Sequence, residues 1–241
     1  MPRANMDDLL NLKMPIPPLP EQRRIAAILN EQMASVERAR AATEAQLGAA
    51  KALPTAYLRA AFNSPEAKAW PRRRLGEVCE FESGQFISRS DILSNGSVPV
   101  YGANGVIGYT SDACFQEPRI VVGRVGSCGA VNRTDGPAWI TDNTLICRPT
   151  ELADFGYIAW FLMSVDFGML RSSSIQPLIT QSTLKSLAIP LPPLPDQQRI
   201  TTMLNEQMAT VERTRKTLEE QLDTINNLPA ALLRRAFRGE L

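Results

Sequence analysis

A long internal repeat constrains this chain more than any other feature of its sequence. Residues 15–62 align without a gap with residues 190–237, and more than half of the positions are identical. The block LNEQMA recurs intact at residues 29–34 and 204–209. Two segments this similar are expected to adopt the same local structure, although two copies are too few for a solenoid.

Each copy begins with a proline cluster, PIPPLP at residue 15 and PLPPLP at residue 190. Consecutive prolines fix φ and remove amide donors, so the chain is expected to be extended there. The last proline, Pro20 or Pro195, suits the first turn of a helix, where amides lack partners anyway. A PxxP ligand for an SH3-like domain is the alternative interpretation, but the same cluster precedes a predicted helix twice.

The segments after the prolines have the heptad spacing of a coiled-coil stripe. The residues predicted to pair the helices are Leu29, Met33, Val36, Leu47, Leu204, Met208, Val211, Leu218, Leu222 and Ile225. The simplest cover for one stripe is the other copy, lying antiparallel, because a domain between the two can reverse the chain. A helix from a second copy or from another protein is the alternative cover.

Proline and glycine predict where these helices end. Pro54 and Pro229 are expected to break them and to start a short second helix that ends near Phe62 or Phe237. Gly239 is expected to stop the last helix.

The middle of the chain has a different character. Between about residues 70 and 185 the heptads vanish, and glycine, valine, isoleucine and threonine increase. Residues 120–125 and 144–147 are typical of short strands, and residues 157–170 have helical apolar spacing. The predicted fold class is α+β: one mixed α/β domain on a twisted or partly closed sheet, flanked by two long repeated helices that form an antiparallel coiled coil.

Charge and residue content exclude several functions. A net charge of +1 excludes a strongly basic, non-specific nucleic-acid coat, but it is compatible with base reading by a few polar groups. The chain has no histidine, the commonest general acid–base group near neutral pH. It also has no nucleophile elbow, Walker loop or paired-acid motif. An enzyme with a cysteine nucleophile is a further hypothesis, disfavoured because no histidine can serve as the base.

The four cysteines, Cys79, Cys114, Cys128 and Cys147, include no CxxC pair. We expect four reduced thiols packed as small apolar groups, and no metal site. The start of the chain does not resemble a signal peptide, and no apolar run is long enough to span a membrane. A cytoplasmic location without membrane attachment is therefore expected.

The order helix, mixed domain, helix, with the helices as copies, resembles the DNA specificity (S) subunit of type I restriction–modification systems. The segments that carry the resemblance are LPPLPDQQRI at 191–200, LNEQMA at 204–209, Ser172–Thr180, Leu187–Pro190, Leu75–Val78 and Gly123–Gly126. Members of this family alternate target-recognition domains with conserved helical spacers.

The resemblance implies boundaries for the parts of the chain. They are a remnant of a preceding recognition domain with a proline-rich lead-in at 1–19, a first helical spacer at 20–64, a target-recognition domain at 65–189, and a proline-rich lead-in with a second spacer at 190–241. Residues 8–14 resemble residues 183–189, so a first recognition domain is expected to have been deleted or cut away. A half-length subunit that pairs with itself is the other interpretation.

The resemblance also implies a function without catalysis. The chain would read one half of a bipartite site in double-stranded DNA and dock the modification (methyltransferase) subunits through its helices. A restriction subunit, a translocase and endonuclease, would join them, and a homodimer is a further assembly to consider. S-adenosylmethionine and ATP are expected on the partner subunits, and no cofactor on this chain. The alternative function is a coiled-coil scaffold protein with a β-rich protein-binding domain.

Polar residues in the predicted loops of the mixed domain are the candidates for DNA contact. They are Arg89, Tyr101, Asn104, Arg124, Asn132, Arg133, Arg171, Ser172, Ser173, Gln176 and Lys185. Arginine favours guanine, and asparagine or glutamine favours adenine, each pair contributing about 1–3 kcal/mol of discrimination. For any one of these residues, a solvated or structural role is the competing interpretation.

Overall fold

The computed structural model describes residues 16–170 and 178–241. These residues form two compact units. The helical unit contains the described residues up to 52 together with 210–241, and the mixed unit contains those from 53 to 209.

Two long helices correspond to the two copies of the repeat. Helix α2 spans Leu19–Asn63 and helix α7 spans Leu194–Phe237, so both begin one residue before the proline expected in the first turn. The predicted breaks at Pro54 and Pro229 are wrong, because both prolines lie inside continuous helices. An internal proline costs about 3 kcal/mol. Ala50 lies before Pro54 and Leu58 lies after it, and both are buried. The packing of the helix on both sides of the proline offsets that cost.

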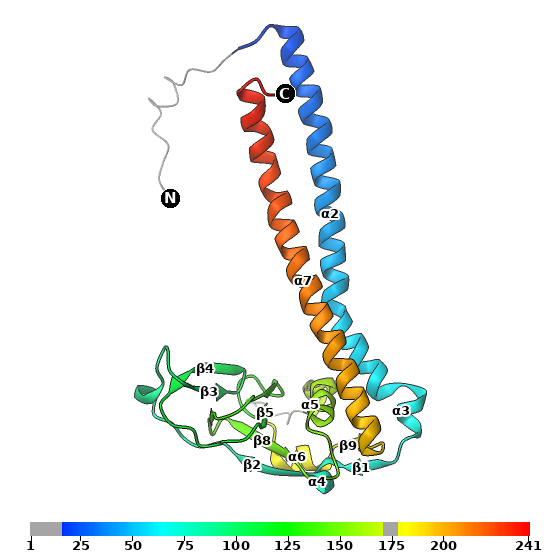
Figure 1. The fold of residues 1–241 in the computed structure, drawn as a ribbon, viewed down its shortest axis with the longest axis vertical. Helices are drawn as coiled ribbons and strands as arrows, with labels where there is room; N and C mark the ends of the chain where they lie inside the picture. Colours follow the sequence, from blue (N-terminus) through cyan, green and yellow to red (C-terminus); the bar gives the residue numbers. More distant parts are fainter. Residues whose placement is uncertain (1–15, 171–177) are drawn as a thin grey trace. The chain divides into compact units, whose positions relative to one another are not determined.

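Within the helical unit, α2 and α7 lie side by side and antiparallel (Figure 1). Leu47 and Ala50 pack with Leu218 in one buried cluster, and Leu222 packs against it. At the other end of this unit, Arg24 Nη2 donates a hydrogen bond to the carbonyl oxygen of Leu241 over 2.7 Å. These contacts cover part of the heptad stripe of each helix.

Gly239 ends α7, as predicted. It has a φ of +72°, its amide donates to the carbonyl of Ala236 over 3.2 Å, and the amide of Glu240 donates to that of Arg235 over 3.0 Å. This pair of bonds is the Schellman arrangement, which requires a left-handed residue.

The mixed unit contains nine strands and several short helices in its described residues, between the end of α2 and the start of α7. In chain order they are α3 (Pro65–Ala69), β1 (Arg72–Arg74), α4 (Leu75–Val78), β2 (Cys79–Ser83), the 3₁₀ helix η1 (Arg89–Asp91), β3 (Val98–Gly102), β4 (Gly105–Thr110), β5 (Ile120–Gly123), β6 (Val131–Arg133), β7 (Trp139–Ile140), β8 (Thr144–Pro149), α5 (Phe155–Ser164), the 3₁₀ helix η2 (Phe167–Leu170), α6 (Gln181–Ser186) and β9 (Ala188–Pro190).

The strands are divided among three sheets, where the sequence predicted one twisted sheet. The largest is antiparallel with the order β2-β8-β5-β6, and a second has the order β4-β3-β7, with β3 and β7 parallel. Strands β1 and β9 form a separate antiparallel pair. The expected strands at 120–125 and 144–147 appear as β5 and β8, adjacent in the largest sheet.

Helix α5 lies at the centre of the main apolar core of the mixed unit. Tyr157, Ile158 and Leu162 are fully buried in it, and every residue from 156 to 162 is buried, as expected for a helix that is apolar on all sides. The predicted helix at 157–170 is shorter than expected: α5 stops at Ser164, and residues 167–170 form η2.

Some heptad residues of α7 belong to the mixed unit and the others belong to the helical unit. In the mixed unit, Leu204 is fully buried and belongs to the same core as Leu58 and Phe62 from the end of α2, with Met208 packed against it. In the helical unit, Val36 and Val211 are buried. Leu29, Met33, Leu222 and Ile225 are half-buried there.

The four cysteines are free, and three of them, Cys79, Cys128 and Cys147, are buried. A hydrogen bond with the Cys79 thiol and burial raise the pKa of the Cys147 thiol. Both effects keep this thiol protonated, so it packs as a small apolar group, as expected.

Candidate nucleic-acid interface

A hollow of about 620 Å³ lies in the mixed unit, between loops of its two larger sheets. Small residues in turns supply part of its lining, and larger apolar side chains supply another part. The residues are Phe86, Ile87, Ile92, Gly102, Ala103, Asn104, Ile107, Val125, Gly126, Ser127, Thr141, Asp142 and Asn143. We call this surface the loop hollow.

The β3–β4 hairpin forms one wall of the loop hollow. Its turn places Ala103 and Asn104 between the strands, followed by Gly105 with a φ of +108°, a value that favours glycine. Gly123, at the end of β5, lies against this turn, and a Cβ there would stand 2.5 Å from the carbonyl oxygen of Ala103. The missing side chain therefore lets the end of β5 approach the hairpin.

The segment after β2 forms another part of the lining. The amide of Gln85 donates to the carbonyl of Ile140 over 2.8 Å, and Trp139 Nε1 donates to the carbonyl of Gln85 over 3.3 Å. These bonds hold the backbone in place, while the next side chain, Phe86, is 75% exposed. A large apolar side chain is thus presented to solvent from a fixed backbone.

The predicted DNA-contact residues divide between this surface and other places. Asn104 lines the loop hollow, and Tyr101 and Arg124 are chain neighbours of lining residues. Asn132 Oδ1 lies near Gly105, and Arg89 lies in η1, between the lining residues Ile87 and Ile92.

Arg133 and Lys185 lie elsewhere. The Arg133 guanidinium stacks over the Trp160 ring of α5, 4.6 Å from its centroid. Lys185 lies on α6, and its side chain faces Gly76 of α4. Arg171, Ser172, Ser173 and Gln176 lie outside the described residues.

Burial changes the chemistry of one predicted residue. It raises the pKa of the Tyr101 phenol above its ordinary value, and the negative charge of Asp135 adds to the effect. A phenol is neutral at physiological pH even at its ordinary pKa of about 10, so Tyr101 is a hydroxyl able to donate or accept a hydrogen bond.

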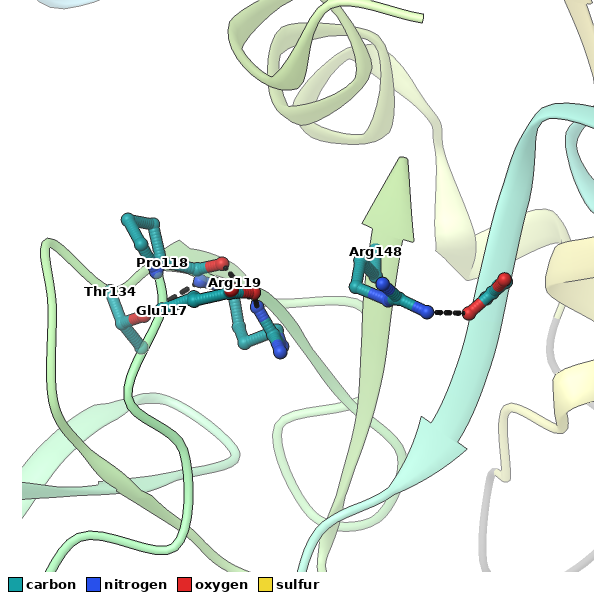
Figure 2. A network of polar contacts seen from close by, with 6 residues as sticks. Glu117, Pro118, Arg119, Thr134 and Arg148 are labelled. Carbon is teal, nitrogen blue, oxygen red and sulfur yellow. Dashed lines mark hydrogen bonds and ion pairs between the residues drawn. The ribbon is translucent and has the colours of Figure 1, made fainter. Parts of the chain in front are cut away.

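Two other arginines of the mixed unit are neutralised by carboxylates (Figure 2). Arg148 of β8 pairs with Glu80 of β2, its register partner, and Arg119 pairs with Glu117 over 3.0 Å. Arg119 also donates to the carbonyl of Pro118. Among the described residues, Arg89, Arg124 and Arg133 have no carboxylate within ion-pair distance, and Arg89 and Arg124 belong to segments that supply the lining of the loop hollow.

Sequence reasoning missed the apolar part of this surface. Phe86 and Ile107 line the loop hollow and are 75% and 54% exposed. Asp142 and Asn143, in the turn before β8, were also missed. A phenylalanine directly after Gly84-Gln85 carried no periodicity, so only the tertiary structure identifies it as a surface residue.

The described residues include no group of three or more His, Cys, Asp or Glu side chains placed to hold a metal ion. In the same residues, no helix is both long enough and apolar enough to cross a membrane.

The comparison with known families decides what kind of domain this is. The model of the type I restriction modification DNA specificity domain matches residues 67–223, which is most of the mixed unit and about the first two thirds of α7. The chain belongs to this family of type I restriction–modification specificity subunits.

Curated relatives and solved structures of specificity subunits agree with this assignment. The EcoKI specificity subunit of Escherichia coli is 26% identical, over 97% of this chain and 58% of the relative, and the EcoDI subunit is 36% identical over 71 residues. Among solved structures, the HsdS subunit from Thermoanaerobacter tengcongensis is 25% identical with a TM-score of 0.69. A chain from a study of type I R-M complex assembly and conformational transition is 25% identical with a TM-score of 0.80.

Both structures are matched over 100% of this chain, which covers 64% and 65% of their own lengths. The chain therefore spans about three fifths of the specificity subunits that it matches along its whole length.

Proposed function

We propose that the mixed unit is a target-recognition domain that reads one half of a bipartite site in double-stranded DNA, and that the loop hollow is its reading surface. The observation that carries the proposal is that Asn104 lines the hollow, while Arg89 and Arg124 belong to two of the segments that supply its lining and have no ion pair with a described carboxylate. Direct reading needs a few polar groups placed against base edges, and does not need a strongly basic face.

The remaining lining residues suit base edges better than phosphates. Phe86 and Ile107 are apolar groups of the kind that contact a thymine methyl, and Asn104 and Asn143 offer the amide that pairs with adenine. Asp142 is an acceptor that repels phosphate but accepts from the amino group of cytosine.

The helical unit is proposed to be a spacer, with α2 and α7 as an antiparallel coiled coil that sets the distance between half-sites and docks the modification subunits. This role is supported by the packing of Leu47 with Leu218 and by the repeat, which gives both helices the same heptad spacing of apolar residues. Methylation of adenine with S-adenosylmethionine, and the restriction subunit's use of ATP, would take place on the partner subunits.

The test is the binding of the chain, with its cognate modification subunit, to a library of DNA duplexes. We expect selective binding that Asn104→Ala relaxes at one base position, with a loss of about 1–3 kcal/mol of discrimination. Lys68→Ala is the matched control for a surface change, because Lys68 is an exposed residue of α3 outside the loop hollow.

Arg124→Ala separates base reading from phosphate contact. A base contact predicts relaxed specificity at one position, whereas a phosphate contact predicts weaker binding to all sequences and a salt slope reduced by about one. If no duplex is bound selectively, with or without the modification subunit, the protein-binding scaffold takes the place of this proposal.

A further inference from the structure

Among the described residues, Phe86 is the most exposed aromatic side chain. It is 75% exposed and lines the loop hollow, whereas Phe237, the next most exposed, belongs to the helical unit and is 59% exposed. A large apolar side chain is stabilised when it leaves water. The ring of Phe86 can therefore gain a favourable contact from a ligand that binds at the loop hollow.

The backbone directly before Phe86 is anchored to β7 and to the residue that follows it. Gly84 permits a close approach, because a Cβ there would stand 2.1 Å from the carbonyl oxygen of Thr141. Gln85 forms a β-bridge with Thr141, and both of its backbone polar groups are bonded to residues of β7. The main chain is thus fixed one residue before the exposed ring.

The far end of the same loop is anchored to β4. The backbones of Leu93 and Tyr109 exchange two hydrogen bonds, of 2.8 and 2.9 Å. Ile92 packs against Gly108, where a Cβ would stand 2.4 Å from Ile92 Cγ2. Residues 86–92 are therefore held at both ends. A phenylalanine on such a loop has only two χ angles to order on binding, and it can press against a ligand without the loop folding back.

The surroundings of Phe86 suit the bases of DNA better than its phosphates. Asn104 and Asn143 line the same hollow, and Arg89 lies in the same loop as the ring. Asp142 is the one charged side chain among the described lining residues, and its carboxylate repels phosphate. A base is uncharged and has an apolar face on which an aromatic ring can stack.

We propose that Phe86 is a wedge, which enters the stack between two adjacent base pairs of the half-site and kinks the duplex there. Apolar side chains, phenylalanine among them, act in this way in proteins that bend DNA. The inference rests on the proposed function and deepens it, because it assigns Phe86 to the faces of base pairs, while Ile107 in the same lining remains at a base edge.

A wedge adds specificity at a base step that no hydrogen bond reads. Kinking and unstacking are easiest at the flexible pyrimidine–purine steps TA, CA and TG. We therefore expect the half-site to contain such a step where Phe86 enters, and the affinity to fall when that step is replaced by the AA step of a stiff A-tract. In Phe86→Ala this dependence on the step should disappear.

The experiment uses the full chain with its cognate modification subunit and the duplex selected from the library. Fluorophores at the two ends of the duplex report the kink by energy transfer. A 2-aminopurine placed at each adenine in turn reports local unstacking by a rise in fluorescence. Both signals are read at saturating complex, so that weaker binding does not imitate a lost kink. We expect a kink of about 20–90° and raised fluorescence next to one step.

Phe86→Ala should remove the kink and the fluorescence rise at that step, and weaken binding about tenfold or more, because base–aromatic stacking is lost. Phe86→Leu keeps an apolar wedge and should restore most of the kink. Leu152→Ala is the matched control and should change neither signal, because Leu152 is a 64% exposed apolar residue of the mixed unit outside the loop hollow. An adenine flipped by the modification subunit also fluoresces, but its signal should remain in Phe86→Ala.

A kink and a fluorescence rise that Phe86→Ala leaves unchanged, while Asn104→Ala still relaxes selectivity, would refute the wedge and keep the proposed reading surface. An intact kink, with an affinity that falls equally in Phe86→Ala and when one thymine is replaced by uracil, would assign Phe86 to a thymine methyl. Loss of modification-subunit binding by Phe86→Ala without DNA would assign the ring to a protein interface. If no duplex is bound selectively, the proposed function fails together with the wedge.

Discussion

The indole of Trp160 donates a hydrogen bond to Asn205 Oδ1 over 3.0 Å, which joins α5 to the first turns of α7 within the mixed unit. Trp160 is 7% exposed, so its donor has little access to water. The repeat duplicates Asn205 as Asn30, an exposed residue of α2. Both asparagines lie at exposed positions, and they differ in the bond that Asn205 accepts from the buried indole, which makes them a matched pair.

Asn205→Ala is expected to destabilise the mixed unit by about 1–3 kcal/mol, because it leaves the buried indole donor unpaired. Asn30→Ala should change stability by less than about 0.5 kcal/mol, as is usual for an exposed position. Denaturant unfolding followed by tryptophan fluorescence measures both. Equal losses for the two variants would contradict the assignment.

Tyr157 anchors α5 through its hydroxyl, which donates to the carbonyl of Pro190 over 2.6 Å. Tyr157→Phe keeps the ring against Phe62 but leaves a buried carbonyl without its donor, so we expect a loss of about 1–3 kcal/mol. Tyr109→Phe, at a half-buried strand position, is the control and should lose less. Thermal unfolding compares them, and a neutral Tyr157→Phe would show that the bond contributes nothing.

Leu218 belongs to the buried cluster of the helical unit, with Leu47 and Ala50. Leu218→Ala should destabilise this unit by about 2–3 kcal/mol, towards the lower end for a buried leucine, because a two-helix pair relaxes around a small cavity. Leu233→Ala, 42% exposed on the same helix, should have little effect. Hydrogen exchange of residues 210–225 gives the local free energy of opening, and equal protection in both variants would refute the pairing.

We predict that ionisation of the Tyr101 phenol lowers the stability of the folded chain at alkaline pH. Burial raises the pKa of its phenol in the folded chain, above the value of about 10 in an unfolded chain. The folded state therefore favours the neutral form, so its contribution is complete below that pH and is lost as the pH rises through the folded pKa. The difference in tyrosinate absorbance between the native chain and Tyr101→Phe isolates this group. A midpoint at or below the ordinary value would contradict the prediction.

The sequence by itself determined the periodic and repeated parts of this protein. The heptads and proline clusters predicted two long helices, and α2 and α7 follow them, because helix formation depends on local spacing. Gly239 was predicted as a stop for the same local reason. The family was also visible in sequence, since LNEQMA and LPPLPDQQRI are contiguous motifs.

Only the tertiary structure decided features that depend on distant neighbours. Pro54 and Pro229 do not break their helices, because packing on both sides outweighs a local penalty that sequence alone overestimates. The loop hollow joins residues from four separate turns, so exposed Phe86 could not be found by periodicity and Arg133 could not be known to stack on Trp160. Leu29 and Leu204 have the same sequence context, yet one is partly exposed and the other fully buried, because burial is set by whether a domain covers the side chain and not by the residues next to it in the chain.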